Sequence, residues 1–98
     1  MKKKENTGLT YVQAASMIKR NPYGTDSKGG NAPNLIRRDD WAENKVLTID
    51  NKGQLRMADV RLNPSTKKHM VPEFNSQVTA REDLWATDWC FIDAADYF

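Results

Sequence analysis

The sequence predicts an α+β fold, a small antiparallel sheet with an N-terminal helix and a short C-terminal helix, assembled as a homo-oligomer. Apolar side chains recur at helical spacing between residues 11 and 18. Two runs rich in strand-forming residues flank a turn signal at 51–53, and a helix-start motif at 79–82 precedes a last apolar run. Helices and strands in this order favour helices packed on an antiparallel sheet.

The chain has 98 residues, which is enough for one domain. Hydrophobic residues make up 39% of it, a low fraction for a domain that must bury its own core. We therefore expect part of the apolar surface to be buried between subunits. Residues 1–8, which begin with three lysines, are expected to form a flexible basic tail, and residues 9–98 a single α+β domain.

The charge is nearly balanced, with 15 basic and 13 acidic residues and a net charge of +2. This balance argues against binding to DNA or RNA, which favours a strongly basic face. No apolar run approaches the ~20 residues of a membrane span, and none follows the first lysines as in a secretory signal. The single cysteine, Cys90, excludes an intramolecular disulfide, so we expect a cytoplasmic protein. From the charge balance and the lack of a long apolar run, we expect no nucleic-acid or membrane partner.

"LTYVQAASMIKRNP" predicts the first helix. Thr10 suits the N-cap because its hydroxyl can accept a hydrogen bond from a free N–H of the first turn. Pro22 ends the helix because it lacks an N–H. The apolar stripe consists of Tyr11, Ala14, Ala15 and Ile18. The next stretch, "YGTDSKGGNAPN" at 23–34, holds three of the five glycines, and we expect it to be a long loop that is either disordered or functional.

"KVLTID" and "QLRMADV" predict a β-hairpin around "NKG", where Asn51 and Gly53 tolerate a positive φ. The side chains alternate, with Val46, Thr48 and Asp50 on one face and Leu47 and Ile49 on the other. "HMVPEFNSQV" is a further strand candidate, in which Pro72 belongs at an edge, a bulge or a strand start.

"TARE" fits a capping box with Thr79 as the N-cap and Glu82 reaching back, so a short helix at about 80–86 is expected. "WCFID" then predicts a last strand. Trp89 enters this strand and is expected in the core, whereas Trp85, one helical turn earlier, is expected in the core or at a subunit interface.

The residue types favour binding over catalysis, with no metal and no cofactor. His69, the single histidine, lies in "TKKHM" and is expected to be an exposed loop or strand-edge residue. One histidine and one cysteine do not make a zinc site, and neither a nucleophile elbow nor a Walker loop occurs. The acidic doublets at 39–40 and 82–83 leave acid–base catalysis by a carboxylate pair open, although such doublets are common on solvated surfaces.

"LIRRDDW" is the most informative polar and aromatic cluster. The guanidinium groups of Arg37 and Arg38 suit phosphate, and Trp41 offers a broad face on which a base can stack. In the alternative interpretation, Trp41 covers the core while the arginines pair with Asp39, Asp40 or the acidic C-terminal part of the chain.

Three segments, "LTYVQAASMIKRNP", "RRDDW" and "VTAREDLWATDWCFID", resemble the phage Thoeris anti-defence protein 2 family, over roughly Leu9 to Asp93. The matching residues are Arg38, Trp41, Asp83, Leu84, Ala86, Asp88 and Trp89. The chain departs from the family pattern where Asp40 replaces a glycine, where Trp85 replaces a leucine, and in its longer loop at 23–34. The family's aromatic position before the closing tryptophan falls on Gln77 without a gap and on Phe74 with a short insertion.

The resemblance implies a sponge, a protein that sequesters a nucleotide immune signal without cleaving it. The ligands implied are glyco-cyclic ADP-ribose and, for some members, cyclic dinucleotides, held by homotetramers in pockets shared between subunits inside a bacterial host cell. Asp83 and Asp88 are expected to be mainly structural. The candidate ligand-binding residues are Arg37, Arg38, Trp41, Phe74, Asn75, Ser76, Gln77, Thr79 and Asp83. The alternative is a phage protein–protein inhibitor or adaptor that acts directly on a host enzyme.

Overall fold

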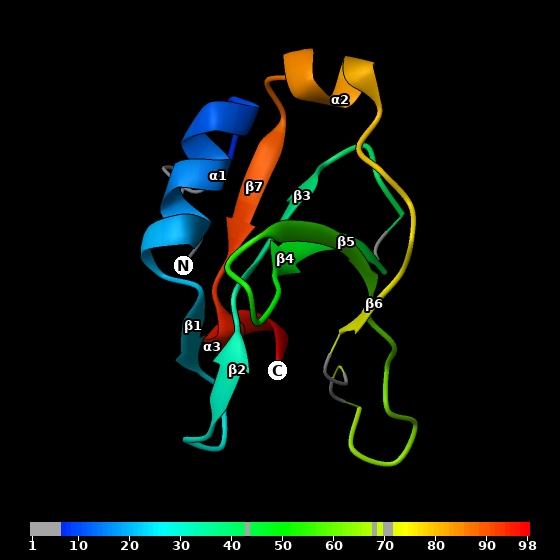
Figure 1. The fold of residues 1–98 in the computed structure, drawn as a ribbon. Coiled ribbons are helices and arrows are strands. Elements are labelled where there is room, and N and C mark those ends of the chain that lie inside the picture. The colour runs from blue at the N-terminus through cyan, green and yellow to red at the C-terminus, as the bar shows by residue number, and fades with distance from the viewer. Residues whose placement is uncertain (1–6, 43, 68, 70–71) are drawn as a thin grey trace.

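The computed structural model describes residues 7–42, 44–67, 69 and 72–98, so the tail expected at 1–8 lies largely outside the described residues. Five antiparallel strands form the main sheet in the order β6-β5-β4-β3-β7, and two more form a separate hairpin (Figure 1). The helices are α1 (Tyr11–Arg20), α2 (Arg81–Trp85) and α3 (Ala94–Tyr97). The strands are β1 (Tyr23–Thr25), β2 (Asn31–Pro33), β3 (Leu35–Arg38), β4 (Lys45–Ile49), β5 (Leu55–Asp59), β6 (Glu73–Phe74) and β7 (Trp89–Ile92). This arrangement confirms the predicted α+β class with an N-terminal helix and a short C-terminal helix.

The main sheet is a middle layer with an apolar cluster on each face. Neighbouring strand residues point to opposite faces, so Ile36 and Leu47 join α1 and Trp89 on one face. Leu35 and Val46 join α3 and β2 on the other. Because β4 is the central strand, all its residues from Val46 to Ile49 are buried, and this explains the imperfect alternation in the sequence.

The predicted start and apolar stripe of α1 are both confirmed. The Thr10 hydroxyl accepts a hydrogen bond from the Gln13 N–H (3.1 Å), and the Gln13 side chain accepts one from the Thr10 N–H (2.9 Å). This reciprocal pair is a capping box, which satisfies two N–H groups that have no partner inside the helix. Ala14, Ala15 and Ile18 are buried against the sheet.

Thr10→Ala is expected to lower the free energy of unfolding by about 1 kcal/mol, because it removes this cap. The matched control is Ser16→Ala on the exposed face of α1, which is expected to raise stability by a few tenths of a kcal/mol because alanine has the higher helix propensity. Urea unfolding followed by circular dichroism measures both. Equal losses in the two variants would contradict a capping role for Thr10.

The expectation of a long loop at 23–34 is wrong, because β1 and β2 pair there as a hairpin. The Asp26 carboxylate orders the turn by accepting hydrogen bonds from the N–H groups of Lys28 (2.9 Å) and Gly30 (2.8 Å). Ala32 of β2 is buried in the core. Strands of three residues are too short to show an alternating pattern, so no strand signal stands out in this stretch.

The predicted hairpin between 45 and 60 is confirmed, with β4 and β5 paired in register from Lys45–Asp59 to Ile49–Leu55. Gly53 has a φ of +80°, as its turn position requires. The strand expected within 69–78 is confined to β6 among the described residues, and Pro72 immediately precedes this edge strand, as predicted.

The short helix after residue 79 exists, but its cap differs from the prediction. The N-cap is Ala80, whose N–H donates to the carboxylate of Asp83 (3.3 Å), so Asp83 takes the role predicted for Glu82. This shift by one residue turns Asp83 inward, and it is buried. β7 is confirmed and so is the burial of Trp89, whereas Trp85 is 78% exposed and lies outside the core of this chain.

His69 is half-buried, so the expectation of an exposed residue is wrong. Its ring stacks on the ring of Tyr97 in α3 with a centroid distance of 3.9 Å, and its Nδ1 lies 3.1 Å from the Tyr97 carbonyl oxygen. It also forms an isolated antiparallel bridge with Leu62, in line with a strand-edge position. His69 therefore helps to pack its segment against α3 by aromatic stacking.

Candidate functional site

The nine candidate residues fall into two groups, and the first surrounds Arg38. The Arg38 Nε donates to Asp88 (2.8 Å) and its Nη1 donates to Asp83 (2.8 Å), so two carboxylates hold the guanidinium group. These contacts raise the pKa of Arg38 above its usual value. Burial pulls the pKa of Asp83 upward, but hydrogen bonds from Arg38, Trp41 and Ala80 outweigh it and hold that pKa below its usual value. The hydrogen bond from Arg38 likewise lowers the pKa of Asp88.

Trp41 and Arg37 are also engaged within the chain. The Trp41 ring packs edge-on against Trp89 (centroids 5.1 Å apart), and its Nε1 donates to Asp83 (3.3 Å). The Lys45 Nζ lies 4.8 Å from the centroid of the same ring. Arg37 donates through Nη2 to the carbonyl oxygens of Trp41 and Ala42.

These contacts correspond to the alternative interpretation of "LIRRDDW", with Trp41 against the core and Arg38 paired with acidic residues. The carboxylates are Asp83 and Asp88 rather than Asp39 or Asp40. The register of the sheet explains the choice, because Arg38 of β3 lies opposite Trp89 of β7 and therefore next to Asp88. A ligand that used Arg38 or the face of Trp41 would have to displace these internal partners.

The second group lines an open groove of about 420 Å³ between β5 and the segment 75–79. In Figure 1 this segment runs along the right side of the view from β6 up to α2. We call this site the β5 groove; it is lined by Leu47, Gln54, Leu55, Arg56, Met57, Asn75, Ser76, Gln77, Val78 and Thr79. It therefore brings together four of the predicted ligand-binding residues, and its volume lies within the range typical of small-molecule sites.

Asn75 explains why the β5 groove is open. Its N–H donates to the Met57 carbonyl oxygen (3.1 Å), which continues the pairing of β6 with β5 by one hydrogen bond. Its side-chain oxygen then accepts from the Gln77 N–H (2.9 Å), and its side-chain nitrogen donates to Asp59 (2.9 Å). This local turn directs the chain away from the edge of β5, so residues 76–79 form the opposite wall of the groove.

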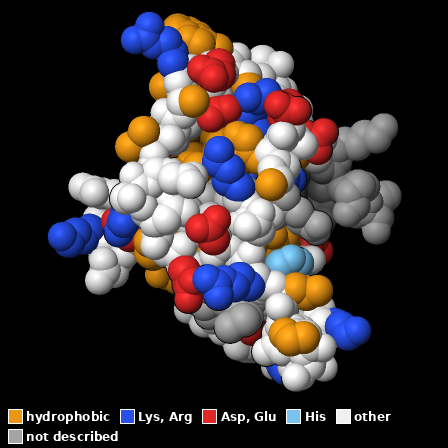
Figure 2. All heavy atoms as spheres, turned by 90° about the vertical axis from the view of Figure 1, so that its right-hand side faces the viewer, with side chains coloured by type: hydrophobic (Ala, Val, Ile, Leu, Met, Phe, Trp, Pro, Cys, Tyr) orange, Lys and Arg blue, Asp and Glu red, His pale blue; other side chains and the backbone are white. Residues whose placement is uncertain are grey.

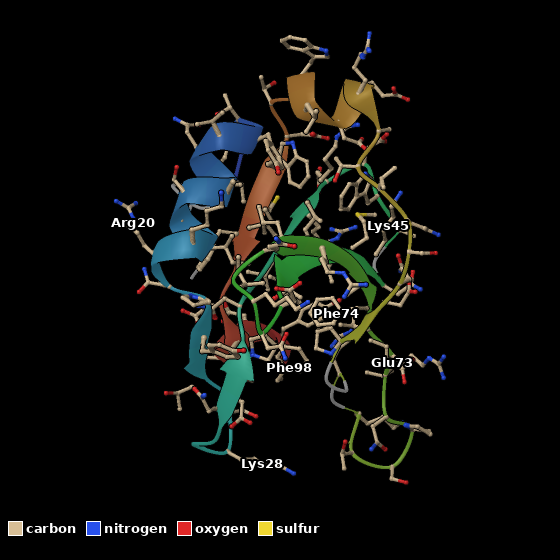
Figure 3. All side chains as sticks on the ribbon, in the orientation of Figure 1. Arg20, Lys28, Lys45, Glu73, Phe74 and Phe98 are labelled. Atoms are coloured by element: carbon tan, nitrogen blue, oxygen red, sulfur yellow. The ribbon has the colours of Figure 1, made fainter. Side chains whose placement is uncertain are left out.

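Arg56 supplies the cation of the β5 groove. Its Cζ lies 5.0 Å from the centroid of the Phe74 ring, and its Nη2 donates to the Asn75 carbonyl oxygen at 3.3 Å. Arg56 is exposed, and no described carboxylate lies within ion-pairing distance of it. Figure 3 shows Phe74 below Lys45, on the side of the molecule away from Arg20 of α1. Phe74 is not one of the lining residues, but it lies beside the groove because its ring contacts Arg56, which is one of them.

Sequence reasoning missed Arg56. The available signal was its place in "QLRMADV", directly between two apolar residues of a strand next to the short edge strand. Without the pairing order, nothing in the sequence distinguished this arginine from others on exposed strand positions. Figure 2 shows that charges of both signs are interspersed on the face nearest the viewer, rather than gathered into one basic surface.

Two other hollows have fewer side chains that could bind an anionic ligand. One of about 400 Å³ lies between β1 and the start of α3, and its described lining has a carboxylate, Asp93, but no cation. The other, of about 320 Å³, includes Asp39, Asp88 and Cys90. Burial and the nearby carboxylate of Asp39 raise the pKa of the Cys90 thiol, which therefore stays protonated near neutral pH.

Among the described residues, no group of histidine, cysteine and acidic side chains is arranged to hold a metal ion. The helices in the described part of the chain are all too short and too polar to cross a membrane. Neither the family models, the curated proteins nor the solved structures contain a match to this chain.

Proposed function

We propose that this chain is a phage anti-defence protein that binds a cyclic nucleotide immune signal, glyco-cyclic ADP-ribose or a cyclic dinucleotide, and sequesters it uncleaved. The observation that carries the proposal is the β5 groove, where Asn75, Ser76, Gln77 and Thr79 lie with the guanidinium of Arg56. The resemblance of the closing segment to the anti-defence family supports the same function.

The groove offers complementary groups to each part of such a ligand. Arg56 provides charge-assisted hydrogen bonds for a phosphate. Leu47, Leu55 and Met57 provide apolar surface for a base or a sugar ring. The amide and hydroxyl side chains of the opposite wall, such as Gln77 and Thr79, can donate to and accept from ribose hydroxyls or base edges.

The lining also favours retention over cleavage. Its described residues include no aspartate, glutamate, histidine, lysine or cysteine, so the groove holds no general acid or base that would work near neutral pH. The guanidinium of Arg56 supplies N–H donors that can stabilise negative charge, but it has no acceptor atom for a substrate proton.

A second copy of the chain is part of the proposal. A sponge must hold its ligand at nanomolar concentrations, which requires about −12 kcal/mol. One aromatic stack contributes roughly 1–3 kcal/mol and one charge-assisted hydrogen bond roughly the same, so a single open groove falls well short. Val78 lines the groove and is 84% exposed, which suits a position that another subunit covers. We therefore propose a homo-oligomer, a tetramer on the family resemblance.

Ser76→Trp is expected to abolish binding, because the added indole occupies part of the groove of about 420 Å³ and blocks the ligand. A ligand at about one hundred times its dissociation constant should stabilise the wild-type fold by about 2.7 kcal/mol and the variant by almost nothing. The measurement is thermal unfolding with a panel of cyclic dinucleotides and cyclic ADP-ribose isomers. Ser16→Trp on the exposed face of α1 is the matched control and should retain the full shift.

The bound molecule is then released by boiling and identified by mass spectrometry. Recovery of the added nucleotide unchanged is the expected result. A cleaved or otherwise altered product would replace the sponge with an enzyme, and the absence of any thermal shift across the panel would remove the proposal.

A protein–protein inhibitor is the second candidate, favoured by a separate observation. Trp85 and Leu84 of α2 are 78% and 44% exposed, and Val12 on α1 is 70% exposed. α1 and α2 are in contact, so these side chains can form one apolar surface for a protein partner. This function would be supported if Trp85→Ala abolished protection against host immunity in a protein that binds none of the nucleotides.

A further inference from the structure

We infer that the unpaired backbone of Leu55 recognises the hydrogen-bonding edge of one nucleobase in the β5 groove, while Arg56 binds the phosphate attached to it. The inference rests on the proposed function and names the ligand unit that each groove accepts. Neither residue was a candidate from the sequence.

The pairing pattern shows which way the backbone of Leu55 points. The Asp50 N–H donates to the Gln54 carbonyl oxygen (2.9 Å), so Gln54 faces β4 through its backbone. In an antiparallel pair, successive residues direct their N–H and C=O groups to opposite sides. Leu55 therefore directs both groups away from β4, on the same side as Met57, whose carbonyl accepts from Asn75.

The residue that would pair with Leu55 on that side is Gln77, two positions beyond Asn75. The Gln77 N–H is instead bonded to the side chain of Asn75 (2.9 Å). Within the described part of the chain, no residue takes its place beside Leu55. Leu55 lines the groove, so a donor and an acceptor of the backbone lie side by side at its wall.

The length of this open edge decides what it can bind. It is bounded on one side by the bond between Asn75 and Met57, and on the other by the turn in which the Gly53 N–H donates to Asp50 (3.0 Å). A peptide that adds as a strand needs a run of consecutive pairs. A nucleobase edge presents one donor next to one acceptor, and the single residue Leu55 is sufficient for it.

Arg56 places one cation next to this edge. It follows Leu55 in the chain, and its guanidinium is held at the rim of the groove by the Phe74 ring (5.0 Å) and the Asn75 carbonyl oxygen (3.3 Å). It is the single charged residue in the described lining. The groove therefore fits one base with one phosphate, and a ligand with two such units would need two grooves.

The test uses the full chain labelled with ¹⁵N, with adenosine 5′-monophosphate as the probe. The Leu55 amide signal is expected to move downfield on titration, as for an N–H that gains an acceptor. N⁶,N⁶-Dimethyladenosine 5′-monophosphate cannot donate from its amino group, and it should bind about tenfold more weakly, the effect of one lost hydrogen bond.

Arg56→Gln is expected to weaken binding of the monophosphate about tenfold, to the level of adenosine, and to leave adenosine binding unchanged. The matched control is Arg61→Gln, which removes another exposed arginine, one that pairs with Glu73 at 3.3 Å. It should leave both affinities unchanged. Equal losses in the two variants would show a general effect of charge and would overturn the role of Arg56.

The inference is wrong if the dimethylated probe binds as tightly as the parent, or if the Leu55 amide does not move. It is also wrong if an extended peptide shifts the Leu55 signal and the nucleotides do not. A cyclic messenger that binds with the Leu55 amide unmoved would overturn this inference and leave the proposed function intact. If no nucleotide binds, both fail.

Discussion

Trp89→Ala is expected to lower the free energy of unfolding by about 4 kcal/mol, the scale for a large aromatic residue truncated in a core. Trp89 is completely buried, and its ring makes edge contacts with those of Tyr11 and Trp41, with centroid distances of 5.2 and 5.1 Å. Its Nε1 also donates to the Asp83 carbonyl oxygen (2.8 Å). The substitution would thus leave a cavity between α1 and the sheet and remove a hydrogen bond that holds α2.

Trp85→Ala is the matched control, because the same side chain is removed only four residues earlier from a site that is 78% exposed. It is expected to change the free energy of unfolding by less than about 0.5 kcal/mol. Both variants are compared by urea unfolding at several protein concentrations. Similar losses at all concentrations would contradict the assignment of Trp89 to the core, whereas a loss for Trp85 that depends on concentration would place Trp85 at a subunit interface.

Asp83→Ala is expected to lower the free energy of unfolding by about 3 kcal/mol at neutral pH, as when one partner of a buried ion pair is removed. The Asp83 carboxylate accepts hydrogen bonds from Arg38, Trp41 and Ala80, so it joins β3, the following turn and α2. Its removal leaves these donors without their acceptor. The neighbouring Glu82 is exposed, and Glu82→Ala is expected to have little effect.

The same contacts predict a direction for the pH dependence. The pKa values of Asp83 and Asp88 are lower in the folded chain than the value of about 4 for an unfolded aspartate. Their contribution to stability is therefore fully present above about pH 4 and is lost as the pH falls through the lower folded pKa values. Urea unfolding of the wild type and Asp83→Ala should show a difference that is constant near neutral pH and shrinks below about pH 4. A difference unchanged at acid pH would contradict the ionic role of Asp83.

The elements predicted correctly from the sequence carry their signals locally. Thr10 and Gln13 form a capping box within one turn, and the apolar stripe of α1 spans only two turns. Likewise, Gly53 and Asp50 fix the hairpin between β4 and β5 within five residues. In each case the residues that determine the structure are also neighbours in the sequence.

Two of the errors arise where a contact distant in sequence decides the outcome. Asp83 rather than Glu82 caps α2 because Arg38, 45 positions earlier, draws the carboxylate inward. His69 is half-buried because Tyr97, 28 positions later, stacks on it. Neither partner could be chosen from local pattern alone, since several residues of the same type compete for each role.

The same difference between local and distant contacts applies to the residues of the candidate site. Asn75, Ser76, Gln77 and Thr79 lie together in the β5 groove because they are consecutive or nearly so in the chain. Arg38 and Trp41 were expected to join them, but the pairing of β3 with β7 places both beside Asp83. Arg56 could be found only from the order of the strands, which sets β5 next to the short β6.

Because the chain leaves the edge of β5 at Asn75, the size of the groove opening and the folding stability depend on different residues. In most binding sites these two properties are coupled. The core lies between the helices and the central strands, whereas the width of the opening depends on where an edge strand stops. Each further residue paired along β5 would shorten the opening by about 3.3 Å without disturbing a single core side chain. Selection can therefore adjust the size of the captured molecule at the margin of this fold while its folding stability stays constant.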